Sequence, residues 1–369
     1  MAALLKEIYS KEFYHLFLQE LKVVYPALNE RKFLQLIFDE KWSDRELKDR
    51  MKHTSFVLSQ ILPSDYKACA KIIEQLVQNL QKKNLNQYGL AFMFLPDFVE
   101  TYGLHHFNIS VKLMEKLTPF TSCEFAVRKF IIHYGNKMVE EMIRWSKHAN
   151  HHVRRLASEG SRPRLPWAIA LPEFKNNPKP ILPILHNLKS DPSEYVRRSV
   201  ANSLNDITKD NPSVVLEITN KWKGKNLETD ALLKHACRTL LKQGDIEVLK
   251  HFGIEDDKQI KLRSFEIITP KVKMGDSLEF TFSLSNSANE PKKIRLEYGM
   301  YYLRANGQHN KKVFKISERE MAPKETLQLN RKQSFKAIST RRFYPGLHKI
   351  SLIVNGKEKG LHNFELTEK

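Results

Sequence analysis

Cysteine is scarce in this chain, with only Cys69, Cys123 and Cys237 among 369 residues. The three lie far apart, their number is odd, and none belongs to a CxxC pair. A disulfide framework or a cysteine-ligated metal site is therefore not indicated, and we expect three reduced, buried thiols. Glycine-rich phosphate loops, GxSxG elbows, HExxH and EF-hand patterns are also missing, so we expect neither a nucleotide nor a metal cofactor.

Long apolar runs are missing as well. No segment reaches the length of a signal-peptide core or a membrane span, so we expect a soluble, cytoplasmic monomer without a membrane partner. Basic residues, by contrast, are abundant, and 61 of them against 42 acidic residues give a net charge of +19. Such an excess favours a polyanionic partner, nucleic acid above all, although a basic surface can also serve solubility alone.

The apolar pattern divides the chain into two unlike halves. From residue 4 to about 252 apolar residues recur every three or four positions, which is the helical period. From about Phe265 the period is two, and Asn-Gly turn dipeptides separate β-rich runs. About seven short strands in roughly 100 residues predict an immunoglobulin-like β-sandwich. We therefore expect a mainly α protein, with a HEAT-like helical solenoid over 1–258, a polar boundary near 253–264 and a small β-sandwich over 265–369.

An internal repeat runs through the helical half. The triplet Val153-Arg154-Arg155 recurs as Val196-Arg197-Arg198 after 43 residues, and Arg238 follows Arg197 by 41, both within the range of HEAT-type helical pairs. An earlier copy, AVRKF at 126–130, lies only 26 residues before the first triplet, so the segment after Glu159 is an insertion. Second helices of stacked pairs line one concave face. The repeat arginines either form a cationic track there or pair with acids of the next repeat.

The least ordinary part of the sequence is HVRRLASEGSRPRLPW at 152–167, which runs from the repeat triplet into the insertion. It sets one carboxylate, Glu159, and one indole, Trp167, among arginines and a histidine, a mixture that makes poor core material and indicates a polyanion site. The indole is available to stack on a sugar or base, or it plugs the loop against the solenoid, and pattern alone favours the plug. The histidines at 148, 151 and 152 have no Cys or carboxylate at a matching spacing, so no metal site is expected.

Three carboxylates, Glu124, Glu159 and Asp206, fall at or near second helices of consecutive repeats. The solenoid could bring them together, and acids on a face that binds a polyanion need a reason, such as stabilising a cationic transition state or placing a water. Each also has an ordinary explanation. Glu124 occupies a capping-box position after Thr121, and pattern alone favours that role. Asp206 could cap a helix or pair with Arg198 or Lys209. Glu159, near a helix C-terminus, is unfavourable to the dipole and is the best functional candidate.

Longer segments carry a resemblance to a known family. They are LIFDEKW, ELKDRMK, FTSCEFAVRKF, HHVRRLASEGSRPRLPWA, EYVRRSVANSLNDITKDNP, YYLRANGQHNKKVFKISE and FYPGLHKISLIVNG, and they run through most of the chain. The chain resembles the DNA alkylation repair glycosylases of the HEAT-like superfamily, the AlkC type more closely than the AlkD type. This resemblance implies hydrolysis of the N-glycosidic bond of cationic alkylated bases in double-stranded DNA, the first step of base excision repair. The bases implied are 3-methyladenine and, in the AlkC type, 3-methylcytosine and 1-methyladenine.

The resemblance also assigns roles to residues. Glu159 would lie nearest the sugar, with Glu124 and Asp206 flanking it and Trp167 against the deoxyribose. AlkD-type enzymes use an aspartate flanked by two tryptophans, and only one tryptophan stands in the matching block, so that role is carried over for Trp167 alone. The predicted DNA contacts are Arg154, Arg155, Arg162, Arg164, Arg197, Arg198 and His152.

The β half is densely basic, with 20 Lys and Arg against 11 Asp and Glu over 265–369. We expect it to close over the duplex opposite the solenoid, with a stabilising appendage as the alternative. Two other functions stay open, because HEAT solenoids often serve as scaffolds. A noncatalytic DNA-binding or damage-sensing protein would bind DNA without releasing a base. A protein-interaction scaffold would bind DNA weakly and with little salt dependence.

Overall fold

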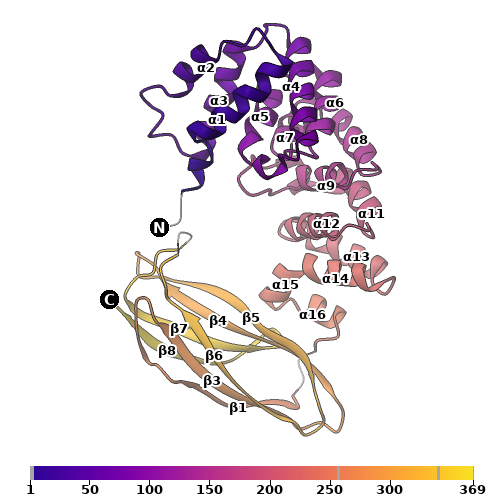
Figure 1. The fold of residues 1–369 in the computed structure, drawn as a ribbon. Coiled ribbons are helices and arrows are strands. Elements are labelled where there is room, and N and C mark those ends of the chain that lie inside the picture. The colour runs from indigo at the N-terminus through magenta and orange to yellow at the C-terminus, as the bar shows by residue number, and fades with distance from the viewer. Residues whose placement is uncertain (1–3, 256–257, 339–340, 369) are drawn as a thin grey trace. The chain divides into compact units, whose positions relative to one another are not determined.

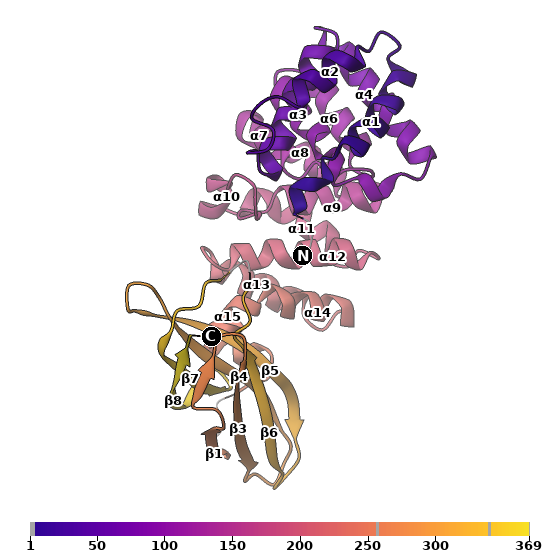
Figure 2. The ribbon, with the colours of Figure 1, turned by 60° about the vertical axis from the view of Figure 1, so that its left-hand side comes forward.

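The structure, a computed structural model, describes residues 4–255, 258–338 and 341–368. Asp256 and Asp257 of the predicted boundary segment lie outside the described residues, as do residues 1–3, 339–340 and 369 of the predicted domains. The chain divides into two compact units between Ala236 and Cys237 (Figure 1 and Figure 2).

The first unit is built of helices throughout its described length. Its α-helices are α1 (Lys11–Val24), α2 (Glu30–Ile37), α3 (Leu47–Ile61), α4 (Tyr66–Lys82), α5 (Phe94–Tyr102), α6 (Phe107–Leu117), α7 (Ala126–Tyr134), α8 (Asn136–Trp145), α9 (His151–Gly160), α10 (Pro172–Asn176), α11 (Leu182–Leu188), α12 (Glu194–Ile207), α13 (Pro212–Trp222) and α14 (Leu227–Ala236). Short 3-10 helices lie at Leu5–Ile8, Asn86–Tyr88, Ala91–Met93 and Lys179–Ile181.

The helices of this unit form a stack. Helices α9, α12 and α14 lie side by side, while α8, α11 and α13 pack against them as a second layer (Figure 1). The V-R-R triplets open the equivalent helices α9 and α12. Side-chain caps begin two of these helices, since Asp65 caps α4 and Asn150 caps α9 by accepting backbone N–H bonds. The predicted helical solenoid is confirmed.

The second unit begins with two short helices and continues as β-strands. The helices are α15 (Arg238–Gln243) and α16 (Ile246–His251). The strands are β1 (Ile260–Ile267), β2 (Lys271–Lys273), β3 (Ser277–Asn286), β4 (Lys292–Leu303), β5 (His309–Met321), β6 (Thr326–Ser334), β7 (Gly346–Val354) and β8 (Lys357–Thr367).

Two sheets make up the β part, ordered β1-β3-β6 and β2-β8-β7-β4-β5. The pairs are antiparallel except β2 with β8. Alternate residues of β3, such as Leu278, Phe280 and Phe282, join Met300 and Ile350 in the core, as the period of two requires. The predicted immunoglobulin-like sandwich of about seven strands is confirmed.

The compact units divide earlier than the predicted limits of 258 and 265. Helices α15 and α16 belong to the β unit because the β7–β8 turn packs closely on them. A Cβ atom on Gly244 would lie 2.7 Å from the carbonyl oxygen of Gly356. The Asn355 amide also donates to the Glu255 carbonyl at 2.5 Å. Whether the predicted limits are the functional ones stays a prediction.

Candidate active site

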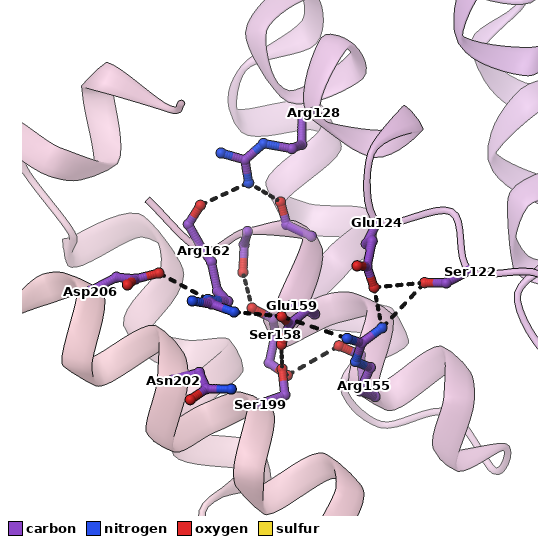
Figure 3. Close-up of polar contacts among 12 residues, drawn as sticks. Ser122, Glu124, Arg128, Arg155, Ser158, Glu159, Arg162, Ser199, Asn202 and Asp206 are labelled. Atoms are coloured by element: carbon purple, nitrogen blue, oxygen red, sulfur yellow. Dashed lines mark hydrogen bonds and ion pairs between the residues drawn. The ribbon is translucent and has the colours of Figure 1, made fainter. Parts of the chain in front are cut away.

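The three carboxylates singled out in the sequence lie along one chain of ion pairs (Figure 3). Glu159 is the penultimate residue of α9, Asp206 lies in the last turn of α12, and Glu124 precedes α7. Arg155 pairs with Glu124 and places Nη2 3.5 Å from Glu159 Oε1. Arg162 then donates to Glu159 Oε1 at 2.6 Å and to Asp206 Oδ2 at 2.9 Å. The helical stack thus brings together acids that lie far apart in the sequence.

Glu159 and Asp206 are the buried members of this chain, at 5% and 2% exposure. Ser199 donates to Glu159 Oε2 at 2.7 Å and accepts from Ser158 at 2.6 Å, while Lys209 lies 3.3 Å from Asp206 Oδ1. Buried charges are tolerated when each is paired and hydrogen-bonded. These contacts therefore fix both carboxylates in place.

Glu124 has a different setting, because it lines a cavity of about 420 Å³ together with Trp167. Its carboxylate accepts a hydrogen bond from Ser122 at 2.9 Å and one from Arg155. The other lining residues are Met51, Asn86, Gly89, Leu90, Met93, Pro96, Asp97, Glu100, Phe120, Thr121, Ser122 and Phe125. Burial raises the pKa of the Asp97 and Glu100 carboxyls. Glu124 and Trp167 thus line the same cavity, whose other lining residues include two phenylalanines and two acids.

Trp167 is exposed, with 64% of its surface accessible, so the plug predicted from the pattern is wrong. Its backbone adopts φ +66°, which a bulky residue rarely does. Its carbonyl accepts a hydrogen bond from Lys48 of α3. The loop therefore uses its backbone, not its indole, as the anchor, and the ring stays available for a partner.

The capping-box role predicted for Glu124 is also wrong. Helix α7 begins at Ala126, with Phe125 as N-cap and no side-chain capping bond. The Glu124 carboxylate is taken by Ser122 and Arg155 instead of by a backbone N–H group. For Asp206, one of the two pairings considered in the sequence, that with Lys209, is present, and Arg162 is its other partner.

Several arginines predicted to contact DNA are engaged within the protein. Arg154 makes a two-pronged bond to Asp191, at 2.6 and 3.0 Å, and Arg164 makes one to Asp210, at 3.0 and 2.7 Å. Arg197 donates to the Asp191 and Pro192 carbonyls. The Arg154–Asp191 pair corresponds to the alternative in which a repeat arginine pairs with an acid of the next repeat, whereas Arg197 bonds to carbonyls just before its own helix, α12.

The other predicted DNA contacts differ in exposure. Arg162 is buried between two carboxylates, which is a poor position for reaching a phosphate. Arg198 is the most open, with 69% of its side chain accessible and Glu194 3.7 Å away. Arg155 stacks its guanidinium over the exposed Tyr195 ring at 4.9 Å, and His152 lies at the edge of the same ring. Tyr195 was not singled out in the sequence.

Arg128 is a further residue that the sequence reading passed over as site material. It is fully buried in α7 and donates to three carbonyls of the segment that carries Glu159 and Trp167. The signal was present, because Arg128 lies in AVRKF, the early copy of the repeat triplet. Burial of this one copy is set by tertiary packing and could not be read from its letters.

Cys69, Cys123 and Cys237 are buried, as predicted, and no disulfide links them. Within 4–255, 258–338 and 341–368 no group of three or more His, Cys, Asp or Glu side chains could hold a metal ion. No helix in those ranges is long and apolar enough to cross a membrane.

Known proteins share this succession of helices and an immunoglobulin-like domain. Residues 261–368 match the family model described as "Uncharacterised protein YhaZ, C-terminal Ig-like domain". The chain is 40% identical to protein YhaZ of Bacillus subtilis (strain 168) over 98% of its own length and 99% of that protein. It also matches the Pseudomonas fluorescens alkylpurine DNA glycosylase AlkC, solved bound to DNA containing an abasic site analog. That match has a TM-score of 0.93 and 34% identity, over 99% of this chain and 100% of that one.

With HEAT-like helices followed by an immunoglobulin-like domain, and a match to AlkC along its whole length, the chain falls in the class of alkylation-repair DNA glycosylases. Within it, the chain belongs to the AlkC family.

Proposed function

We propose that this protein is a monofunctional DNA glycosylase that removes cationic N-alkylated bases from double-stranded DNA and so initiates base excision repair. The observation that carries the proposal is that Glu124 and the exposed Trp167 line the same cavity. The chain that holds them matches AlkC over 99% of its length. The proposed substrates are 3-methyladenine, 3-methylcytosine and 1-methyladenine. Its place would be with the chromosome in the cytoplasm.

The leaving base needs no general acid from the protein. An alkylated base that already carries a positive charge takes the electron pair of the C1′–N bond and departs neutral, so no acid has to protonate it. Positive charge then grows on the deoxyribose, where a nearby carboxylate stabilises it. Water adds its oxygen to C1′ and releases a proton to a carboxylate or to solvent, which leaves an abasic site and a free base. The π face of an indole adds about 0.5–1 kcal/mol against such a cation.

The geometry favours Glu124 over Glu159 as the carboxylate nearest the sugar, which reverses the expected order. Glu159 has both oxygens occupied by Arg162 and Ser199 within a buried network. Glu124 lines the open cavity beside Trp167. In this assignment Glu159 does not contact the sugar. It contacts Arg155, which also pairs with Glu124, and so helps to orient the Glu124 carboxylate.

We further propose that the basic β domain contributes to DNA binding, because residues 265–369 include 20 Lys and Arg but only 11 Asp and Glu. On the helical unit, Arg198 and the exposed Tyr195 ring, which contacts His152 and the largely enclosed Arg155, are the accessible candidates. Contacts of this kind lower affinity steeply as salt rises.

Base release from methylated DNA tests the proposal. The protein is incubated with duplex DNA containing 3-methyladenine in the presence of EDTA, and the free base is measured. We expect release by the wild type, and a rate about 10²–10³-fold lower for Glu124→Gln, the range found when one group that stabilises transition-state charge is removed. DNA affinity should change little. DNA binding without release of any alkylated base would instead identify a noncatalytic damage-sensing protein.

A further inference from the structure

The buried guanidinium of Arg128 holds the segment that carries the proposed reactive groups. Its Nη1 donates to the carbonyl oxygens of Gly160 at 3.0 Å and Arg162 at 2.8 Å, and its Nε donates to that of Ile169 at 2.5 Å (Figure 3 shows this residue above the ion-pair chain). The first two acceptors stand where α9 ends, and the third lies just beyond Trp167. One side chain from α7 thus joins both ends of a short loop.

The other ties of the loop include the bond from Arg164 to Asp210 and the buried side chain of Leu165, which both precede the indole. Between the anchored carbonyls run residues 163–168, with Trp167 exposed and held through its own carbonyl by the half-buried Lys48. Gly160 lets α9 end close against α7, because a Cβ atom there would lie 2.4 Å from Val127 Cγ2. That close approach is what brings the Gly160 and Arg162 carbonyls within reach of Arg128.

The guanidinium keeps its charge in this position. Burial lowers the pKa of Arg128 to about 10, and the neighbouring Arg162 acts in the same direction. Asp206, Glu124 and Glu159 oppose the shift, so at neutral pH Arg128 stays protonated. Because its hydrogen bonds go to backbone carbonyls, this buried cation adds positive charge near the three carboxylates without bonding to any of them.

We infer that Arg128 is a positioning residue for base release, which acts by fixing the Trp167 loop and the end of α9 that carries Glu159. This inference rests on the proposed function. Lysine would keep the charge but not the planar fork that reaches three carbonyls. A misplacement of about 1 Å in a catalytic group can cost 10²-fold in rate, so Arg128→Lys is expected to lower the single-turnover rate of base release by about 10- to 100-fold. DNA affinity should stay within about twofold.

A double-mutant cycle separates positioning from general destabilisation. If Arg128 acts through Trp167, then Arg128→Lys should slow a Trp167→Ala protein by less than about threefold, because residues acting as one unit are not additive. Arg50→Lys is the matched control. Arg50 is 4% exposed in α3 and also donates to backbone carbonyls, those of Arg45 and Lys6. We expect it to leave the rate of base release unchanged. Full multiplication of the Arg128 and Trp167 effects would overturn the inference.

Hydrogen exchange supplies a test that does not need activity. We expect Arg128→Lys to speed amide exchange in 161–171, which includes the Leu171 N–H bonded to the Pro163 carbonyl at 3.1 Å, while Arg50→Lys leaves that segment unchanged. Unchanged exchange would overturn the inference even in an active enzyme. Conversely, a wild type that releases no base refutes the proposed function, and exchange still decides the role of Arg128. If Arg128→Lys does not fold, Gly160→Ala, which forces α9 away from Val127, should give the same exchange result.

Discussion

Arg162 and Arg198 allow a paired test of what the arginines of the helical unit do. Arg162 is buried between Glu159 and Asp206, whereas the Arg198 side chain is 69% accessible. Replacing Arg162 by Met keeps most of the volume but removes a cation that two buried carboxylates share. Breaking a buried pair in this way costs about 3–5 kcal/mol. Because Lys209 and Ser199 remain as partners, we expect the free energy of unfolding to fall by about 3 kcal/mol.

Stability of the helical unit can be followed by fluorescence alone. The four tryptophans are Trp42, Trp145, Trp167 and Trp222, and all belong to the first unit. At about 2–4 °C per kcal/mol for a unit of this size, Arg162→Met should melt about 6–12 °C lower than the wild type. Arg198→Met, as the exposed counterpart, should stay within about 0.5 kcal/mol of the wild type.

DNA binding should show the opposite pattern. If Arg198 contacts a phosphate, Arg198→Met lowers the slope of log affinity against log salt by about 0.9, and Arg162→Met leaves it unchanged. The comparison uses undamaged duplex DNA at several salt concentrations and a temperature at which both variants are folded. An Arg162→Met protein of normal stability with a reduced slope would refute the ion-pair reasoning and return Arg162 to the DNA surface.

Two further predictions concern His348 and Trp167. His348 is fully buried; its Nδ1 accepts from the Leu303 N–H and its Nε2 lies 2.9 Å from the Tyr344 carbonyl, as suits a neutral ring. Burial lowers the pKa of His348 below its usual 6.5, so the β domain should lose stability as pH falls from 6.5 through the pKa of the folded protein. His348→Gln should flatten this pH dependence, measured by urea unfolding followed by circular dichroism. Equal pH dependence in wild type and variant would contradict the prediction. Trp167→Phe keeps a π face and should release base about two- to fivefold faster than Trp167→Ala; equal rates would exclude a role for the ring face.

The fold was predictable because its determinants are local. A change of apolar period from about 3.6 to 2 separates helices from strands, and the recurring V-R-R triplet marks equivalent helices. The inserted loop could be located because it interrupts the repeat after Glu159. The unit boundary was less accessible, since α15 and α16 read as solenoid helices and only their packing on the β7–β8 turn assigns them to the β unit.

The sequence named the residues of the proposed site, but not how they are arranged. Glu124, Glu159, Asp206 and Trp167 were all named from the sequence, and the structure links the three acids through Arg155 and Arg162. Which carboxylate is proposed to lie nearest the sugar could not be read from the sequence, because that depends on which one is enclosed by partners and which one lines a cavity. Arg128 has the same origin as the other repeat arginines, yet it alone is buried beneath the loop.

By itself the sequence determined the two-domain architecture, the excess of positive charge and the set of acids and the indole, because periodicity, composition and repeat spacing are properties of the chain. Only the tertiary structure decided which arginines are engaged within the protein, which carboxylate lines a cavity and which side chain bonds to the carbonyls of the loop. These depend on burial and partner choice, which arise when helices distant in sequence are stacked against one another.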